Sequence, residues 1–392
     1  MISALFFTWF AAAVIWTVNA LRRPVIPGTG LPPMWLPGML ISELAPWYFL
    51  GRPAVAALFI WAGALDLTVG RIGLVLFVVS ELGLLILIRR SVIAAKDAGG
   101  SAGVRSLFPT TARVPDGVTV ETDVPYWDDY TTDIYRGPNG DNAAALIYLH
   151  PGSWMRGRPG RQALGALYTL AASGWVVLDV RYPKSPAATF PEHLIGVKRA
   201  ILFAKNPGNG LGIDPTRVAI AGGSSGAHLA ALAALTWDNP RLQPGFEDAD
   251  ASVIACVPHY GIYDLLVRNP TRYDWPFIAK VILKTTVHDS PGLYRLGSPV
   301  DQVRPDAPPF LVVHGEFDSV VLPAESRHFV TALQSVGASV RYHEVRGAQH
   351  GFDAIQSMRT RAVGNLVVQF LQECAGGLPR EGSSAAGPET SP

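Results

Sequence analysis

Arg217-Val-Ala-Ile-Ala-Gly-Gly-Ser-Ser-Gly-Ala-His-Leu-Ala230 is a short apolar run that breaks at Gly222-x-Ser224-x-Gly226 and continues as an Ala/Leu-rich helical pattern. The pattern predicts a strand that turns sharply into a helix, with the serine in a strained backbone conformation at the turn. The flanking glycines let the chain pass close to itself without a Cβ clash. The serine oxygen is then presented at the end of the sheet, where it can act as a nucleophile.

A serine nucleophile needs a histidine base and a carboxylate that orients the histidine. After a turn of this kind, the acid and then the histidine follow the serine, each on a loop after a strand. The run Phe310-Leu-Val-Val-His314 has the pattern of a buried strand and leads to Asp318. The run Ser339–Val345 alternates with period two, as a half-buried edge strand does, and leads to His350. We therefore predict Ser224, Asp318 and His350 as the catalytic residues.

An earlier loop is a candidate for binding negative charge. Acyl transfer places charge on the former carbonyl oxygen, which preorganised N–H groups stabilise. The strand pattern of Ala144–Leu149 ends in His150-Pro151-Gly152-Ser153-Trp154. When a serine nucleophile lies on a strand-to-helix turn, the loop at this position supplies one backbone N–H donor for the oxyanion. The backbone N–H of Ser225, directly after the nucleophile, supplies a second.

These motifs resemble those of the bacterial esterases of the hormone-sensitive-lipase group of α/β-hydrolases. In that group the oxyanion loop is usually His-Gly-Gly-x-Trp, and the turn that carries the nucleophile, called the nucleophile elbow, is usually Gly-Asp-Ser-Ala-Gly-Gly. The resemblance runs from about residue 128 to 372. It also includes Asp179-Val-Arg-Tyr182, Phe190-Pro191, Gly212-Ile-Asp-Pro215 and His314-Gly-x-x-Asp318. It implies an α/β-hydrolase fold, with a mostly parallel sheet covered by helices on both faces, and ester hydrolysis without a metal or organic cofactor.

The loop departs from the family pattern at Pro151, which replaces the first glycine and has no N–H. The family's donors align with Gly152 and Ser153, so the resemblance implies that the oxyanion hole survives this change. We therefore predict an oxyanion hole formed by the N–H groups of Gly152, Ser153 and Ser225.

The elbow departs from the family pattern at two places. Gly223 stands where the family has aspartate, and Ala227-His228 stands where it has Gly-Gly or Gly-Asn. His228 lies one helical turn after Ser224, where it could line the pocket, but we interpret it as a structural residue packed within its helix. These changes bear on the subfamily to which the chain would belong more than on the predicted catalytic chemistry.

Apolar residues are concentrated in the first hundred positions, and the mean hydropathy of the whole chain is +0.23. Ile2–Leu21 contains no charge and is long enough to cross a bilayer core of about 30 Å. Trp47–Leu65 and Ile72–Ile88 are two further candidates, whereas Met34–Leu44 is interrupted by proline, glycine and glutamate and is typical of an interfacial or re-entrant segment. We predict about three membrane spans within residues 1–90.

The charge distribution favours an anchor and predicts its orientation. A signal peptide carries positive charge before its apolar run, whereas Arg22 and Arg23 follow the first run. With three spans, the basic residues at the span ends lie on one side of the membrane, and Arg71 is the exception on the other side. The positive-inside rule assigns that side, and the hydrolase domain with it, to the cytoplasm. The other interpretation is a helical cap buried against the hydrolase domain, as related esterases have.

Glu81 lies near the middle of the third apolar run, where an ionised side chain costs at least about 2.5 kcal/mol. We predict that its carboxyl group is neutral or paired. Thr8 and Trp9 are candidate partners because they lie at a similar depth in the first run, and the hydrolase domain could also cover this helix face.

The remaining chain divides into three parts. We predict a small, polar linker over residues 91–113, the hydrolase domain over 114–374, and a disordered Gly/Ser/Pro-rich tail over 375–392. Strand patterns at Trp175–Val180, Val218–Ala221 and Val253–Val257 and a helical pattern at Arg161–Ser173 give the alternation of a parallel sheet. The aromatic segment Ile262–Val300 predicts either a lid over the active site or a contribution to the core.

Composition excludes several functions. The net charge of +1 gives no electrostatic reason to expect nucleic acid, and the chain has no phosphate loop or zinc-ligand spacing. Cys256 and Cys374 suggest no disulfide framework, which agrees with a reducing compartment. We predict a membrane-anchored serine carboxylic-ester hydrolase acting on a small-molecule or lipid ester. An acyltransferase or peptidase with the same triad, and a binding module that has lost catalysis, stay open as alternatives.

Overall fold

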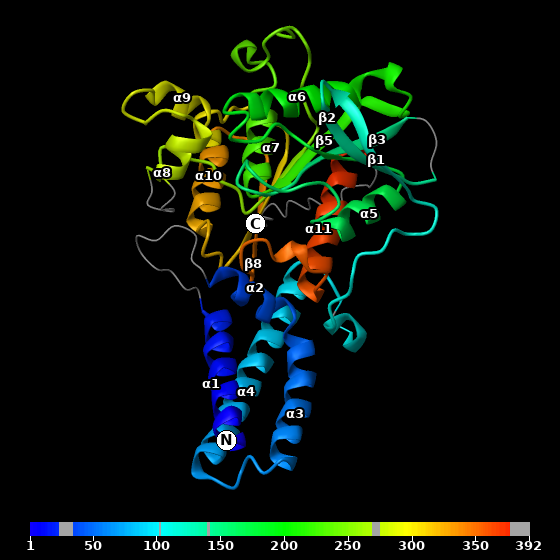
Figure 1. Ribbon diagram of the computed structural model, residues 1–392. Coiled ribbons are helices and arrows are strands. Elements are labelled where there is room, and N and C mark those ends of the chain that lie inside the picture. Colours follow the sequence, from blue (N-terminus) through cyan, green and yellow to red (C-terminus); the bar gives the residue numbers. More distant parts are fainter. Residues whose placement is uncertain (23–33, 102, 139–141, 269–274, 377–392) are drawn as a thin grey trace, which may run out of the picture.

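The computed structural model describes residues 1–22, 34–101, 103–138, 142–268 and 275–376. Four N-terminal helices lie at one end of an α/β body: α1 (Ile2–Leu21), α2 (Trp35–Glu43), α3 (Ala45–Trp61) and α4 (Thr68–Asp97). Helices α1, α3 and α4, which we call the stalk, run side by side away from the body (Figure 1). Helix α2 lies where the stalk meets the body.

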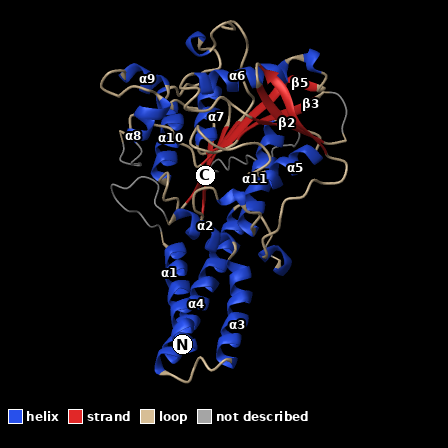
Figure 2. Cartoon of the chain, in the orientation of Figure 1, coloured by secondary structure: helices blue, strands red, loops and turns tan. Residues whose placement is uncertain are grey.

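An eight-stranded sheet forms the centre of the body (Figure 2). Its strands are β1 (Thr119–Trp127), β2 (Tyr130–Arg136), β3 (Ala143–Leu149), β4 (Val176–Val180), β5 (Ile213–Gly223), β6 (Cys256–His259), β7 (Phe310–Gly315) and β8 (Val340–Val345). They lie in the order β1-β2-β4-β3-β5-β6-β7-β8. Strand β2 pairs antiparallel with β1 and β4, and all other pairs are parallel. The predicted α/β-hydrolase fold is confirmed.

Helices cover both faces of the sheet. On one face lie α5 (Leu164–Ala172), α11 (Met358–Cys374) and the end of α4; on the other lie α6 (Glu192–Lys205), α7 (Ser225–Leu235) and α10 (Pro323–Ser335). Side chains along a strand alternate between the two cores, so Ile147 of β3 joins one and Tyr148 joins the other. Both faces are buried, as a parallel sheet requires.

The predicted strands at 144–149, 175–180 and 339–345 correspond closely to β3, β4 and β8, and β8 is an edge strand as predicted. Strand β5 starts earlier than predicted, at Ile213, because the chain already pairs with β3 there. Strand β6 starts at Cys256, later than predicted. Strands β1 and β2 fall outside the predicted set, because β1 is a largely exposed edge strand without apolar alternation.

Among the described residues, α1 and α4 are each long and apolar enough to cross a membrane, and α2 with α3, bent by 84°, could count as a third span. Helix α2 coincides with the segment 34–44 that the sequence marks as interfacial or re-entrant. Helix α3 ends at Trp61, so the predicted second span of 47–65 is too long. Gly63, with φ of +86°, adopts the left-handed conformation that follows the end of a helix.

Helices α1 and α4 pack closely because glycines of α4 lie at the contact. A Cβ on Gly73 would lie 2.8 Å from Cδ1 of Phe6, and a Cβ on Gly83 would lie 2.5 Å from Cγ2 of Thr17. Small residues at such positions let two helix backbones approach in an apolar environment, where close packing holds helices together.

Helix α4 continues beyond its apolar run to Asp97. Ala94 is fully buried in the core cluster that α4 shares with α11. This burial holds the last turns of α4 helical, so the predicted linker of 91–113 starts too early. The predicted disordered tail falls almost wholly on residues 377–392, which lie outside the described residues.

Glu81 is buried in the stalk, and neither of its carboxyl oxygens has a hydrogen-bond partner among the described residues. The Glu81 carboxyl group interacts electrostatically with the guanidinium of Arg52, a buried residue of α3. The candidate partners are wrong: the Thr8 hydroxyl donates within its own helix, and Trp9 is 53% exposed. Depth along a helix does not determine which face of the helix a side chain occupies.

Candidate active site

Ser224 lies at the turn from β5 into α7, with φ of 52° and ψ of −116°. This is the strained conformation that the sequence predicts for it. A Cβ on Gly222 would lie 2.6 Å from the carbonyl carbon of Gly226, and a Cβ on Gly226 would lie 2.1 Å from the Leu149 oxygen. The glycine spacing is therefore a steric requirement of the turn.

The structure brings the three predicted catalytic residues into one hydrogen-bonded chain. Ser224 Oγ lies 3.0 Å from His350 Nε2, and His350 Nδ1 lies 2.7 Å from Asp318 Oδ2. Asp318 is fully buried, whereas Ser224 and His350 each remain 8% exposed. In this geometry the imidazole can accept the serine proton while the carboxylate fixes the tautomer protonated at Nδ1.

The carboxylate of Asp318 is held from several sides. Its Oδ1 accepts backbone hydrogen bonds from Val320 at 2.9 Å and Val321 at 2.8 Å. Burial by itself raises the pKa of this carboxyl, but the interactions with His350 and His314 outweigh it and hold the pKa well below its usual range. The group is therefore ionised at neutral pH.

His314 is a residue of this site to which the sequence analysis gives no role. Its Nε2 donates to the Val321 oxygen at 2.8 Å and lies 3.2 Å from Asp318 Oδ2, while its Nδ1 accepts from Ser326 Oγ at 2.6 Å. The side chain is fully buried near the end of β7. The motif His314-Gly-x-x-Asp318, which belongs to the family resemblance, is the sequence signal that could have identified it.

The loop after β3 turns through three consecutive residues with positive φ. Gly152, Ser153 and Trp154 have φ of 148°, 54° and 56°, and a Cβ on Gly152 would lie 2.1 Å from the Arg156 oxygen. Within the described part of the chain, the N–H groups of Gly152, Ser153 and Ser225 donate to no backbone acceptor. All three predicted donors are thus available to a ligand oxygen.

His228 supports this loop from the elbow helix. Trp154 Nε1 donates to His228 Nδ1 at 3.2 Å, and His228 Nε2 donates to the Gly297 oxygen at 2.8 Å. His228 is only 1% exposed. His228 is thus a buried residue that ties the loop after β3 to the C-terminus of α9 (Pro291–Leu296), and these partners lie outside the helix within which the sequence predicts it to pack.

Tyr182 supports the loop from the opposite side. Its hydroxyl donates to the His150 oxygen at 2.9 Å and lies 3.3 Å from Ser225 Oγ. Its ring stacks on the His150 ring with centroids 4.6 Å apart. Burial lowers the pKa of His150 to about 4, so this imidazole is neutral at neutral pH and adds no charge to the loop.

Tyr260 supports His350 and explains the unusual elbow. Its ring meets the His350 ring at a steep angle with centroids 4.8 Å apart. Its hydroxyl donates to Asp353 Oδ1 at 2.5 Å, and Asp353 Oδ2 lies 3.0 Å from His259 Nδ1. A Cβ on Gly223 would lie 2.8 Å from the Tyr260 hydroxyl oxygen, which explains glycine at this position.

Helix α2 connects the N-terminal region to the site. The Trp35 ring meets the His350 ring edge-on, with centroids 6.1 Å apart. At the other end of α2, the buried Glu43 pairs with the buried Arg359 of α11, with 3.2 Å between Oε2 and Nε, and accepts from Ser357 Oγ at 2.6 Å. The candidate active site therefore lies at the end of the body that faces the stalk (Figure 1).

The aromatic segment 262–300 contributes to the core. Tyr263 and Tyr294 are fully buried, and the Tyr263 ring stacks on Phe329 with centroids 4.2 Å apart. For these two residues the core interpretation is confirmed. Tyr273 lies outside the described residues.

Over the described ranges, no group of three or more His, Cys, Asp or Glu side chains is arranged to hold a metal ion. Around Ser224 the described residues place the imidazole of His350, the carboxylate of Asp318 and backbone N–H groups.

Fold and site geometry define an α/β-hydrolase. The family model BD-FAE matches residues 132–333, and the chain belongs to this family. It is 40% identical over 258 residues to the esterase LipQ of Mycobacterium tuberculosis, covering 64% of this chain and 61% of LipQ. It is 38% identical over 235 residues to the esterase LipC of the same organism, covering 59% and 58%. The chain spans about six tenths of the length of these relatives.

Solved structures agree on the fold. A truncated carbohydrate esterase from gut microbiota superposes with a TM-score of 0.58 at 23% identity, covering 67% of this chain and 98% of that chain. A thermophilic esterase from Thermogutta terrifontis superposes with a TM-score of 0.55 at 23% identity, covering 68% and 97%. The predicted kinship with esterases of the α/β-hydrolase superfamily is confirmed.

Proposed function

We propose that this protein is a membrane-anchored serine carboxylic-ester hydrolase that works through an acyl-enzyme. The observation that carries the proposal is the hydrogen-bonded chain from Ser224 Oγ through His350 to the buried Asp318. The relatives LipQ and LipC are named esterases, which supports an ester as the substrate.

The proposed reaction has two halves. Ser224 Oγ attacks the acyl carbonyl carbon as His350 Nε2 takes the serine proton, and the imidazolium that forms is stabilised by the ionised Asp318. The tetrahedral intermediate then collapses, and His350 returns the proton to the leaving alcohol oxygen. Water deprotonated by His350 attacks the acyl-enzyme in the second half, and the proton returns to Ser224 as the acid leaves.

The N–H groups of Gly152, Ser153 and Ser225 would receive the oxyanion in both halves. Pro151 does not interfere, since the donors follow it in the loop. Removing one donor from an oxyanion hole typically lowers kcat by about 10²–10³-fold. Trp154, held by His228, and Tyr182 would keep the loop in place while charge develops.

The stalk supports anchoring in a membrane. Exposed apolar side chains cover its outer surface, for example Leu58 at 67% and Leu82 at 56% exposure, which is costly in water. Because the Trp35 ring of α2 contacts His350, a membrane that surrounds the stalk would lie near this side of the site. We infer that the natural substrate is an apolar or lipid ester that reaches Ser224 from the membrane side.

Turnover of p-nitrophenyl esters by the purified full chain tests the function. We expect hydrolysis, with long acyl chains preferred over short ones when the protein is in lipid nanodiscs. Labelling by a fluorophosphonate probe should compete with the ester. A folded protein that neither hydrolyses any ester nor reacts with the probe would leave only the binding-module alternative.

We also propose that the hydrolase domain faces the cytoplasm, because Arg89, Arg90 and Lys96 follow the apolar run of α4. Ser101 is exposed next to α4 and suits a labelling experiment. In a Cys374→Ser background, Ser101→Cys should stay unlabelled by an impermeant maleimide in intact cells and become labelled after lysis. Labelling in intact cells would place the domain outside.

A further inference from the structure

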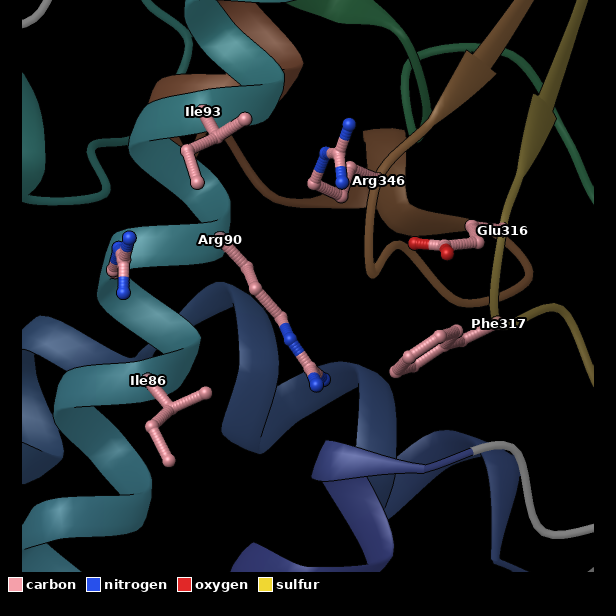
Figure 3. A pocket seen from close by; sticks show the side chains of 7 residues that line it. Ile86, Arg90, Ile93, Glu316, Phe317 and Arg346 are labelled. Atoms are coloured by element: carbon pink, nitrogen blue, oxygen red, sulfur yellow. The ribbon is translucent and has the colours of Figure 1, made fainter.

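A cavity of about 310 Å³ lies at the junction of the stalk and the body, apart from the candidate active site. Figure 3 shows α4 on one side of it and the loops that follow β7 and β8 on the other. Arg89 and Arg90 come from α4, and Arg346 comes from the loop after β8. Glu316 is the acidic side chain in the lining.

The charge of the cavity lining favours an anion. The carboxylate of Glu316 accepts the Gly347 N–H at 2.8 Å, and Arg346 lies 3.4 Å from Asp97 at an exposed ion pair. Arg90 donates one hydrogen bond to the Leu21 oxygen at 2.8 Å and keeps further N–H groups. Arg89 has no hydrogen bond or ion pair within the described residues. Three guanidinium groups and one carboxylate thus line the cavity; Asp97 partly offsets the charge of Arg346 in the exposed ion pair, and the Arg90 guanidinium lies 5.0 Å from the centroid of the Phe317 ring.

The shape of arginine restricts the chemistry of that anion. A guanidinium presents a planar fork of N–H groups that matches two oxygens of a phosphate or carboxylate. The cavity is about ten times the ~30 Å³ that one water occupies in the liquid, which leaves room for a phosphate and its substituents.

The position of the cavity along α4 also favours a ligand with an apolar part. The apolar run of α4 ends directly before Arg89, so the cavity lies at the level of lipid headgroups if the stalk spans a membrane. Ile86 and Ile93, seven residues apart on one helix face, line the cavity on either side of the arginines, and Ile86 is 47% exposed. The lining thus offers charge for a headgroup and apolar surface for the start of an acyl chain.

We propose that this cavity binds a phosphate group, supplied by an anionic phospholipid or by free phosphate. The lipid source rests on the proposed membrane anchoring, whereas phosphate recognition does not. The loops that would contact the ligand carry the catalytic candidates: Phe317 directly precedes Asp318, and Arg346 precedes His350 by four residues. A bound headgroup would therefore hold the site against the membrane surface.

Native mass spectrometry of the full chain in detergent tests the proposal, with short-chain phosphatidylglycerol, phosphatidylcholine and inorganic phosphate as separate ligands. We expect phosphatidylglycerol to bind more tightly than phosphatidylcholine, and the pair Arg89→Gln with Arg346→Gln to weaken it at least tenfold. Arg71→Gln removes the same charge at the other end of α4 and should bind as the wild type does. Displacement of the lipid by inorganic phosphate at similar concentrations would assign free phosphate as the source.

Equal binding of phosphatidylglycerol by the double variant and by Arg71→Gln would overturn the proposal. So would the absence of both lipid and phosphate binding to the wild type. Fluorophosphonate labelling of the double variant checks that its fold is intact. Alkaline extraction of cell membranes tests the anchoring separately: a chain that stays in the membrane but does not select phosphate refutes this inference alone.

Discussion

His314 Nε2 and His350 Nδ1 approach the same oxygen, Oδ2 of Asp318, at 3.2 Å and 2.7 Å. His314 Nδ1 accepts a hydrogen bond from Ser326 Oγ, so its Nε2 carries a proton in the neutral form. The carboxylate that orients the base is thus itself oriented by a second, fully buried imidazole. This arrangement makes His314 a positioning residue in the proposed mechanism.

Replacing His314 should therefore slow the chemical step more than it weakens substrate binding. His314→Phe removes the Nε2–H that the Val321 oxygen and Asp318 Oδ2 share, and it leaves Ser326 Oγ and the Val321 oxygen without this partner, at a cost of about 1–3 kcal/mol in the free energy of unfolding for each buried group. We expect kcat to fall with KM nearly unchanged, and His314→Gln, which can still donate, to recover part of the rate. Steady-state kinetics and thermal unfolding measure both effects, and equal loss in the two variants would speak against a hydrogen-bonding role.

Removing the nucleophile should abolish acyl-enzyme formation while leaving the fold intact. We expect Ser224→Ala to lose fluorophosphonate labelling and esterase turnover together, because the triad acts as one unit. Ser225→Ala is the matched control: alanine keeps the backbone N–H, and the Tyr182 hydroxyl still donates to the His150 oxygen. It should keep most of the activity. Labelling at Ser225 in the wild type would show that the nucleophile is misassigned.

Asp318 should make the free energy of unfolding depend on pH in the acidic range. Its pKa is lowered in the folded protein from an ordinary value near 3.8, so its ionised form stabilises the fold fully above that value, and this contribution is lost as the pH falls toward the folded pKa. The free energy of unfolding of the wild type should fall more steeply below about pH 4 than that of Asp318→Asn. Urea unfolding at a series of pH values measures the two slopes. Asp318→Asn should also lose most activity at neutral pH, because it disturbs the His350 tautomer.

The sequence predicts the local parts of the site and misses the parts that tertiary contacts create. Ser224, Gly222 and Gly226 follow from spacing, since the clash that each glycine avoids involves the turn itself or the strand beside it. The role of Tyr260 depends on a contact between residues 93 positions apart in the chain, because its hydroxyl is held by Asp353 from the loop after β8. No periodicity in the sequence reports such a contact.

The stalk illustrates the same limit at the level of whole helices. Hydropathy locates the apolar runs. It does not show which face of a helix packs against its neighbours, nor whether tertiary contacts extend a helix beyond its apolar run. The end of α4 stays helical to Asp97 because Ala94 is buried in the hydrolase core, and a composition shift toward small residues concealed this. Depth along the apolar run likewise predicts the wrong partner for Glu81, whereas the packing of α3 against α4 brings Arg52 to it.

Glu81 and Arg52 should prove to be energetically coupled. Arg52 also donates to Thr17 Oγ1 at 3.0 Å and to the Ser80 oxygen at 3.5 Å, so it holds three helices of the stalk together. Glu81→Leu leaves the buried guanidinium without its countercharge and should lower the unfolding temperature of the detergent-solubilised protein clearly. Arg52→Leu should do the same by leaving the carboxylate unpaired.

The double variant Glu81→Leu with Arg52→Leu should be less destabilised than the sum of the two single variants, because it removes both buried charges at once. A coupling energy of about 0.5–3 kcal/mol is expected for residues that interact directly. Thr8→Ala provides the control, since the Thr8 hydroxyl donates within its own helix and should not couple to Glu81. Strict additivity of Glu81→Leu and Arg52→Leu would show that the two charges stabilise the stalk independently, and Glu81 would then need a different role.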